Sequence, residues 1–366
     1  MALERVIISG GGTGGHIFPA VAIANKIKEE NPDAEILFIG AEGKMEMEKV
    51  PQAGYKIIGL PIRGFQRKFA LSNFLLPFKI LQSIWKARKI IKKFNPQVVV
   101  GVGGYASGPT LQMATMLKIP TVIQEQNSFA GKTNKILGNK VSKVCVAYEN
   151  MERYFPKDKI VFTGNPVRAN VVEIEGKRED AFDFFGLDAS KKTILVVGGS
   201  LGARTLNDSL KTKIKQLQES EIQVIWQCGK YQHDSLKEEL KNTDMRGIVL
   251  TEFILKMDLA YAAADVIISR AGALAVSELC LIGKPIILIP SPNVAEDHQT
   301  KNAMALVKNG AAIMIPDQEG REKMVDTMLE LIKDETQQKQ LAENIKKMAT
   351  PAADEKIVAV IKEVLK

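Results

Sequence analysis

Three glycine-rich loops, each following an apolar run, set the strongest limit on how this chain folds. The loops are Ser9–Gly15, Gly101–Pro109 and Gly198–Ala203. The run before the first loop, Val6–Ile8, has the length and composition of a buried strand. A glycine loop lets a ligand approach the backbone, and the start of a following helix presents N–H groups and a positive dipole. This pattern predicts sites for anionic ligands, most often phosphates.

Short apolar runs alternate with helix-like stretches along the whole chain, which predicts an α/β fold with parallel sheets. Beyond the first run, the expected strands are Glu35–Ile39, Lys56–Gly59, Gln97–Val100, Thr121–Gln124, Val144–Ala147, Ile160–Thr163, Thr193–Val197, Gln223–Gln227, Ile248–Leu250, Val266–Ser269, Ile286–Ile289 and Ala312–Ile315. A long helix is expected over about Ser72–Phe94, with a break or restart at Pro77.

The strand–loop–helix layout recurs in the second half, which indicates two Rossmann-like domains in tandem. A Pro/Gly break at 164–168 and a polar stretch at 173–180 come just before the recurrence. A chain of 366 residues is long enough for two domains. We therefore expect a first domain over 1–165 and a second over 166–350, with a C-terminal helix, 351–366, that packs back onto the first.

The net charge of +8 is concentrated in an acid-free stretch, since no Asp or Glu occurs between Lys49 and Gln124. Such a block favours phosphate-bearing partners, namely nucleic acid, anionic lipid or a polyanionic substrate. Aromatic and aliphatic residues interrupt the basic run, which suits a surface lying on anionic lipid. We expect Phe69–Phe78 to be partly exposed, and the apolar residues later in the expected helix, Ser72–Phe94, to be core.

No apolar run is long enough to span a bilayer and no signal peptide is evident.

Several side chains beside these loops have chemistry that a phosphate or sugar site requires. His16 stands at a helix start directly after the first loop, where packing gives no reason for a histidine. Ser200 offers a hydroxyl next to backbone N–H groups, and Arg168 could reach a phosphate from the break between domains. Glu278, inside an expected helix, could accept both hydrogens of a ribose diol.

The three cysteines are far apart in apolar contexts and are interpreted as buried thiols in a reducing compartment. The sequence shows neither a D-x-D motif nor a His/Cys cluster with ligand spacing, so no metal is expected.

Three other functions fit parts of the pattern. Gly10-x-Gly12-x-x-Gly15 with Glu42 could bind a nicotinamide dinucleotide. Gly198-x-Ser200-x-Gly202 fits the nucleophile elbow of a serine hydrolase, with His233 or His298 as base. The basic block alone could belong to a module that only binds membranes. The dinucleotide and hydrolase interpretations each explain one glycine loop, and the membrane module explains none.

Taken together, the motifs resemble those of the MurG family of N-acetylglucosaminyltransferases. In order along the chain they are G-G-T-G-G-H-I-F-P-A, G-V-G-G-Y-A-S-G-P, E-Q-N, G-N-P-V-R, G-G-S-L-G-A-R, S-R-A-G-A-L-A-V-S-E and D-H-Q-T-K-N-A. The match extends over essentially the whole chain. Each motif alone is weak, but their shared order and spacing make the resemblance specific.

The resemblance implies a GT-B fold, in which two Rossmann-like domains face each other across a cleft. The donor would be UDP-N-acetylglucosamine, bound mainly by the second domain. The acceptor would be lipid I, a muramyl-pentapeptide diphosphate on a polyprenol, and no nucleic acid or cofactor would be involved. The donor-binding residues carried over from the family motifs are Thr13, Gly14, Gly15, Asn127, Arg168, Ser200, Ile254, Ala273, Leu274, Glu278 and Gln299. No role is assigned to His298.

The implied reaction is a single displacement with inversion that produces lipid II for peptidoglycan, and so serves cell-wall formation, cell shape and division. The enzyme would act at the cytoplasmic face of the inner membrane as a peripheral protein. His16 could remove the proton from the attacking C4 hydroxyl, or could only hydrogen-bond the loop or the donor diphosphate; Glu125 is the next candidate base. Another UDP-sugar-dependent GT-B transferase acting on a lipid acceptor is the alternative.

Overall fold

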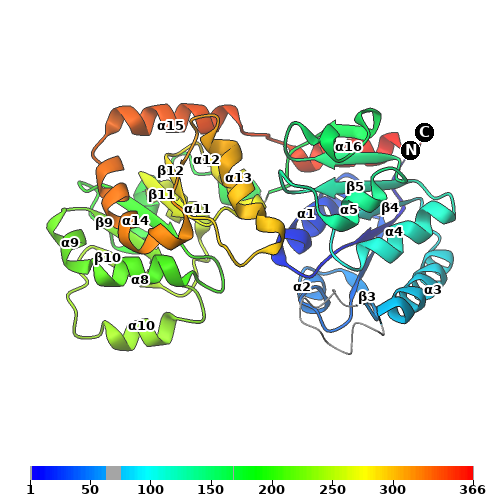
Figure 1. Cartoon of the computed structure of the whole chain (residues 1–366), viewed down its shortest axis with the longest axis horizontal. Coiled ribbons are helices and arrows are strands. Elements are labelled where there is room, and N and C mark those ends of the chain that lie inside the picture. The colour runs from blue at the N-terminus through cyan, green and yellow to red at the C-terminus, as the bar shows by residue number, and fades with distance from the viewer. Residues whose placement is uncertain (1, 63–75, 168, 366) are drawn as a thin grey trace. The chain divides into compact units, whose positions relative to one another are not determined.

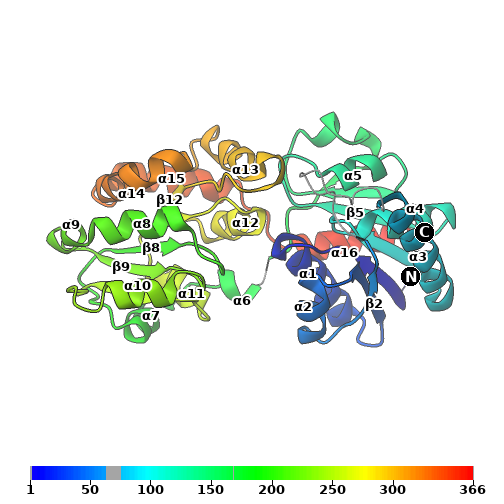
Figure 2. The same cartoon turned by 60° about the horizontal axis from the view of Figure 1, so that its bottom comes forward.

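The computed structural model describes residues 2–62, 76–167 and 169–365, and they form two α/β units. Unit 1 comprises Met1–Val167 together with Thr350–Lys366, and unit 2 comprises Arg168–Ala349. The chain therefore leaves unit 1 once and returns to it for its last helix. Figure 1 and Figure 2 show each unit as a sheet covered by helices.

Unit 1 has a sheet of seven parallel strands in the order β3-β2-β1-β4-β5-β6-β7. The strands are β1 (Arg5–Ser9), β2 (Glu35–Ala41), β3 (Lys56–Leu60), β4 (Val98–Gly101), β5 (Thr121–Glu125), β6 (Lys143–Val146) and β7 (Ile160–Phe162). The helices are α1 (Gly14–Glu30), α2 (Glu46–Gln52), α3 (Leu76–Phe94), α4 (Ser107–Met116), α5 (Lys132–Leu137), η2 (Met151–Arg153), η3 (Lys157–Lys159) and α16 (Ala353–Glu363).

The core of unit 1 has two layers because successive strand residues point to opposite faces of the sheet. Val6 and Ile8 of β1 pack with α1 and α16, whereas Ile7 between them packs with α3, α4 and α5. α16 buries Ile357 and Ile361 completely, beside Ile17 and Ile23 of α1. Residues from the two ends of the chain thus share one hydrophobic layer.

Unit 2 has six parallel strands in the order β10-β9-β8-β11-β12-β13. The strands are β8 (Thr193–Val197), β9 (Gln223–Gln227), β10 (Ile248–Thr251), β11 (Val266–Ser269), β12 (Ile286–Leu288) and β13 (Ile313–Met314). The helices are α6 (Ala169–Val172), α7 (Arg178–Phe185), α8 (Arg204–Thr212), α9 (Ile214–Glu219), α10 (His233–Glu239), α11 (Met257–Ala263), α12 (Ala273–Ile282), η4 (Ala295–Asp297), α13 (His298–Val307), α14 (Asp317–Leu331) and α15 (Glu335–Lys347).

The predicted α/β class with two parallel sheets is confirmed. The three cysteines are free and buried, as expected. Among the described residues, no helix is long and apolar enough to cross a bilayer.

Helix α3 differs from the expectation. Its buried positions are Ser83, Ala87 and Ile91, four residues apart, and its opposite face exposes Phe78, Leu81 and Trp85 at 69%, 56% and 59%. The expectation that the later apolar residues are core was therefore wrong for Leu81 and Trp85. The expected exposure of Phe78 is confirmed, whereas Phe69–Leu75 lie outside the described residues.

Candidate functional site

In unit 1, the strand order reverses between β1 and β4, and the first two glycine loops follow these neighbouring strands. Such a switch point at the carboxyl ends of the strands is where open α/β sheets bind ligands. The loops touch through their backbones. A Cβ on Gly104, where φ is +86°, would lie 2.3 Å from the Gly11 carbonyl oxygen, so this position accepts only glycine.

His16 lies in the first turn of α1 and is half-buried between the two loops. Its Nδ1 is 3.0 Å from the Gly11 carbonyl oxygen and 3.4 Å from the Thr13 hydroxyl. Because a carbonyl only accepts, Nδ1 carries a proton, and in the neutral ring the basic lone pair is therefore on Nε2. Nε2 faces the second loop, 3.0 Å from where a Cβ on Gly103 would be.

Glu46, which the sequence motifs did not single out, is buried beneath the first loop. Its carboxylate accepts hydrogen bonds from the backbone N–H groups of Gly12 and Ala41. The Gly12 N–H, one of the loop donors that were expected to bind an anionic ligand, thus donates to Glu46 instead. Glu42, the acid that a dinucleotide site would need, instead forms an exposed ion pair with Lys86 at 2.7 Å.

Glu125 ends β5 next to the switch point, and its buried carboxylate is surrounded by donors. Oε1 accepts from the backbone and side-chain nitrogens of Asn127 at 3.1 and 3.4 Å. Oε2 accepts from Gly131 N–H at 3.0 Å and from Asn134 Nδ2 at 2.9 Å. Asn134 was also missed from the sequence; its Nδ2 is 3.7 Å from where a Cβ on Gly103 would be, so this network borders the second glycine loop.

In unit 2, the order reverses between β8 and β11, and the third glycine loop follows β8. A pocket of about 400 Å³ opens there. Its lining is Gly198–Thr205, Arg270, Ser291–Asn293, Gln299 and Asp317. Of the predicted residues, Ser200 and Gln299 both contribute, and Gln299 Oε1 accepts from Ser291 N–H at 2.8 Å.

Arg270 lines this pocket together with a second cation, Arg204, and no role was predicted for either from the sequence. The Nη1 of Arg270 donates to Asp317 at 2.5 Å and to the carbonyl oxygens of Ile289 and Pro290. These contacts tie the end of β11 to the end of β12 and to the start of α14. Arg270 is thereby held at the wall of the pocket.

The other predicted donor residues of unit 2 lie outside the pocket lining. Ala273, Leu274 and Glu278 are on α12, which follows β11, and Ile254 is buried after β10. The hydroxyl of Tyr261 donates to Glu278 Oε2 at 3.3 Å. In unit 1, Thr13 and Gly15 are exposed at the start of α1 beside half-buried Gly14. Arg168 lies outside the described residues.

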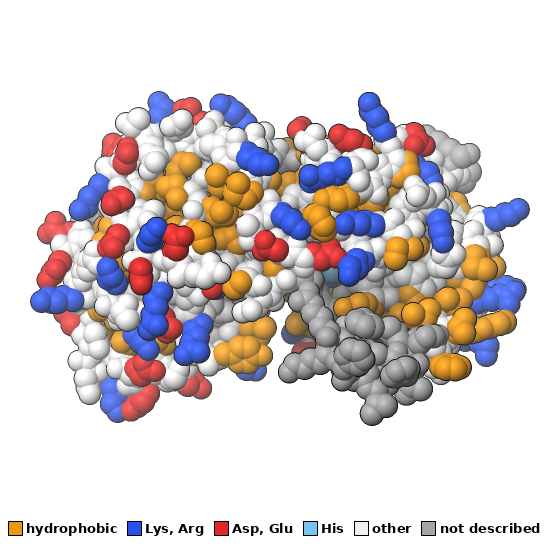
Figure 3. Space-filling model, viewed as in Figure 1, with side chains coloured by type: hydrophobic (Ala, Val, Ile, Leu, Met, Phe, Trp, Pro, Cys, Tyr) orange, Lys and Arg blue, Asp and Glu red, His pale blue; other side chains and the backbone are white. Residues whose placement is uncertain are grey.

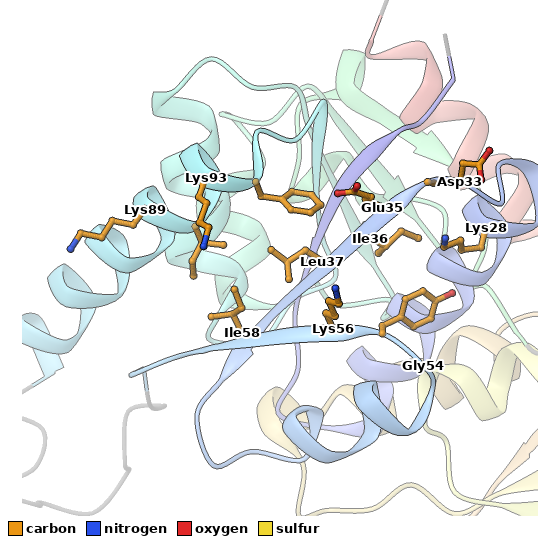
Figure 4. A pocket seen from close by; sticks show the side chains of 14 residues that line it. Lys28, Asp33, Glu35, Ile36, Leu37, Gly54, Lys56, Ile58, Lys89 and Lys93 are labelled. Atoms are coloured by element: carbon orange, nitrogen blue, oxygen red, sulfur yellow. The ribbon is translucent and has the colours of Figure 1, made fainter.

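A larger cavity in unit 1, of about 800 Å³, is not the site that these residues indicate (Figure 4). It lies at the amino ends of β2 and β3, between the carboxyl ends of α1 and α3, with Lys28, Lys56, Lys89 and Lys93 around an apolar floor. Ligands of open α/β sheets bind at the opposite ends of the strands.

Two family models match the chain. The glycosyltransferase family 28 N-terminal domain matches residues 6–146, and the glycosyltransferase family 28 C-terminal domain matches residues 193–357. Together they extend over most of both units.

Curated relatives and solved structures agree with these matches. The chain is 55% identical to a protein of Bacteroides fragilis over 99% of this chain and 95% of the relative. It is 54% identical to one of Parabacteroides distasonis, over 100% and 99%. Both are named UDP-N-acetylglucosamine–N-acetylmuramyl-(pentapeptide) pyrophosphoryl-undecaprenol N-acetylglucosamine transferase. A crystal structure of MurG from Acinetobacter baumannii is 30% identical, covers 98% of this chain and 99% of its own, and has a TM-score of 0.79.

Proposed function

Because this chain belongs to glycosyltransferase family 28, and within it to the MurG enzymes, we infer that it transfers N-acetylglucosamine from UDP-N-acetylglucosamine to lipid I to give lipid II for peptidoglycan. The observation that carries this is identity above one half, over nearly the full length, to relatives named for that reaction. Two parallel-sheet units, as in a GT-B transferase, agree with it.

The donor diphosphate would bind in the pocket of unit 2. The amides of the third glycine loop, the Ser200 hydroxyl and the N-terminus of α8 would stabilise the negative charge that develops on the leaving diphosphate. Glu278 on α12 would accept from the ribose hydroxyls, with Ile254 near the uracil and Gln299 at the sugar. This assignment is supported by the position of all these residues after the carboxyl ends of strands of one sheet.

His16 would be the general base. In a single displacement with inversion, the C4 oxygen of the acceptor forms a bond to the anomeric carbon, while the bond from that carbon to the UDP oxygen breaks. UDP leaves with the electron pair, and the C4 proton passes to Nε2 of His16. The Gly11 carbonyl supports this assignment because it accepts from Nδ1–H and so directs the basic lone pair to Nε2.

Glu125 would position the loop after β5 and would not take the proton. Its two oxygens already accept four hydrogen bonds from Asn127, Gly131 and Asn134. Because both nitrogens of Asn127 donate to Glu125, this carboxylate fixes the position of Asn127, which is proposed to contact the UDP-sugar.

The enzyme would act as a peripheral protein on the cytoplasmic face of the membrane, through α3. Phe78, Leu81 and Trp85 form an exposed apolar stripe at helical spacing, and Lys89 and Lys92 continue it toward the end of the helix. Figure 3 shows hydrophobic side chains beside Lys and Arg over α3, at the lower right.

A UDP-release assay with several UDP-sugars and a short-chain lipid I analogue tests the function. We expect release that needs both UDP-N-acetylglucosamine and the acceptor. Faster acceptor-dependent release from another UDP-sugar would favour a different UDP-sugar transferase, and release without any acceptor would contradict the transfer.

A further inference from the structure

We propose that Glu46 is a positioning residue that holds His16, through one peptide unit of the first glycine loop, in the tautomer that accepts the substrate proton. The proposal rests on the proposed function in so far as it treats His16 as the base. Glu46 itself is buried, with 1% of its surface exposed, and so touches no substrate.

The carboxylate of Glu46 connects two backbone segments of unit 1. Oε2 accepts from Gly12 N–H at 2.8 Å, in the loop after β1, and Oε1 accepts from Ala41 N–H at 2.9 Å, at the end of β2. Hydrogen bonds from N–H groups to a carboxylate are stronger than those between neutral groups. The loop is therefore fixed to the neighbouring strand.

The surrounding glycines make room for this side chain. A Cβ on Gly11 would lie 2.2 Å from the Glu46 carboxyl carbon, and one on Gly40 would lie 2.5 Å from its Cγ. A side chain at either position would therefore displace Glu46 from its place beneath the loop. Burying a carboxylate is unfavourable unless its oxygens are hydrogen-bonded, so a niche with two aimed N–H donors indicates a positioning role more than simple space filling.

The same peptide unit carries the contact to His16. The Gly12 N–H that donates to Glu46 and the Gly11 carbonyl that accepts from His16 Nδ1 belong to one planar peptide group, on opposite sides of it. Glu46 polarises this group, which strengthens its carbonyl as an acceptor. A chain of hydrogen bonds therefore runs from the Glu46 carboxylate through the Gly11–Gly12 peptide to the His16 imidazole. It keeps the proton of His16 on Nδ1 and the lone pair on Nε2.

Glu46→Gln tests the link because it keeps the shape of the side chain. The Gln amide has one oxygen, so its NH₂ must face the N–H of either Gly12 or Ala41. Nitrogen-15 NMR of the ring measures the tautomer directly. The chain has three histidines, and a His16→Gln spectrum assigns the signal of His16. We expect a smaller Nδ1–H fraction and a kcat lower by about 10- to 100-fold, with the KM for UDP-N-acetylglucosamine unchanged.

Glu48→Gln is the matched control, since Glu48 lies on the same helix and is exposed. It should change neither the tautomer nor kcat. If Glu46→Gln does not fold, Glu46→Asp replaces it, because its shorter carboxylate reaches only one of the two N–H groups.

Three outcomes are distinct. A folded Glu46 variant with the wild-type tautomer overturns the proposal, whatever its kcat. An altered tautomer with reduced kcat supports it. An altered tautomer with unchanged kcat supports the positioning by Glu46 but removes His16 as the base in the proposed function.

Discussion

At the scale of single residues, the site depends on contacts between segments that are distant in sequence. His16 and Ser200 could be selected because each lies in or directly after a glycine loop, Glu278 because a carboxylate in an expected helix could bind a ribose diol, and Gln299 only through the family resemblance. Glu46 could not, because its role arises from the alignment of β1 with β2, which sets Ser9 beside Ile39 and places the first loop over α2. A sequence does not show that register.

His16→Ala should lower kcat by about 10²- to 10⁴-fold, because a general base contributes about that much. Affinity for UDP should stay near the wild-type value, since the pocket of unit 2 is unchanged. The acidic limb of the pH–rate profile should flatten as well. His16→Gln is the control: its amide can still donate to the Gly11 carbonyl but cannot accept a proton, so it should be equally slow. Weaker UDP binding at an unchanged kcat would instead make His16 a binding residue.

Glu278→Ala should weaken UDP binding by about 10- to 100-fold, because it removes charge-assisted hydrogen bonds worth about 1.5–3 kcal/mol each. Titration calorimetry with UDP measures this. Tyr261→Phe is the comparison, since it removes only the hydroxyl that donates to Glu278 and should cause a smaller loss. Equal affinity in wild type and Glu278→Ala would move the ribose contact to another residue.

At the scale of elements, sequence patterns located every strand that the structure describes but did not decide which helix faces are covered. The apolar spacing in α3 fits either a core face or an exposed stripe. The structure buries Ser83, Ala87 and Ile91 and leaves Leu81 and Trp85 exposed. Which face is buried depends on where α3 crosses the sheet, and periodicity does not contain that information.

Replacing Leu81 and Trp85 together by Ser should reduce co-sedimentation with anionic vesicles by about an order of magnitude, since their apolar surface would no longer enter the interface. Binding by the wild type should also fall with added salt, which screens the lysines. Ile136→Ser changes an equally exposed apolar residue on α5 and should have no effect. Vesicle binding that persists in the double variant would place the membrane contact elsewhere.

The half-buried Lys284, which binds at the C-terminal end of α11, predicts that the stability of unit 2 depends on pH. Lys284 donates to the carbonyl oxygens of Tyr261, Ala262 and Ala264 at 2.6, 2.9 and 2.5 Å. Burial lowers the pKa of Lys284 from 10.5 to about 8; Arg178 acts in the same direction and Asp265 opposes it. Between about pH 8 and pH 10.5, Lys284 is protonated in the unfolded chain but largely neutral in the folded one. The unfolded chain therefore binds more protons than the folded chain, so unit 2 should gain stability as the pH rises through this window.

Urea unfolding, followed by the fluorescence of buried Trp226 in a Trp85→Phe background, measures that gain at one pH below the window and one inside it. Lys284→Met should abolish the gain. An equal gain in the variant would assign it to another group.

At the scale of the whole molecule, the chain is two units of which one is discontinuous. Recurrence of the strand–loop–helix layout was sufficient to expect two α/β domains. The last helix, 351–366, was also expected to pack back onto the first domain, but its amphipathic pattern does not show which face of the sheet it covers. Its apolar residues complete the layer over β1, β4, β5 and β6, and α16 itself contacts α1 and β6.

Ile361→Ala should therefore lower the stability of unit 1 by about 2–5 kcal/mol through the cavity it leaves in that layer. Hydrogen exchange of the β1 and β4 amides should accelerate, while the unfolding of unit 2 reported by Trp226 should not change. Lys356→Ala, at an exposed position of the same helix, is the control. Destabilisation confined to unit 2 would contradict the role of α16.

The return of the chain to unit 1 also fixes the order in which a ribosome can complete the two units. Unit 2 is continuous in sequence, so all of it is synthesised before α16 follows. During that time α1 has no partner for the face that Ile357 and Ile361 later cover. The N-terminal half of the chain is thus translated first but completed last, and its uncovered apolar face is where a nascent-chain chaperone has the most surface to protect.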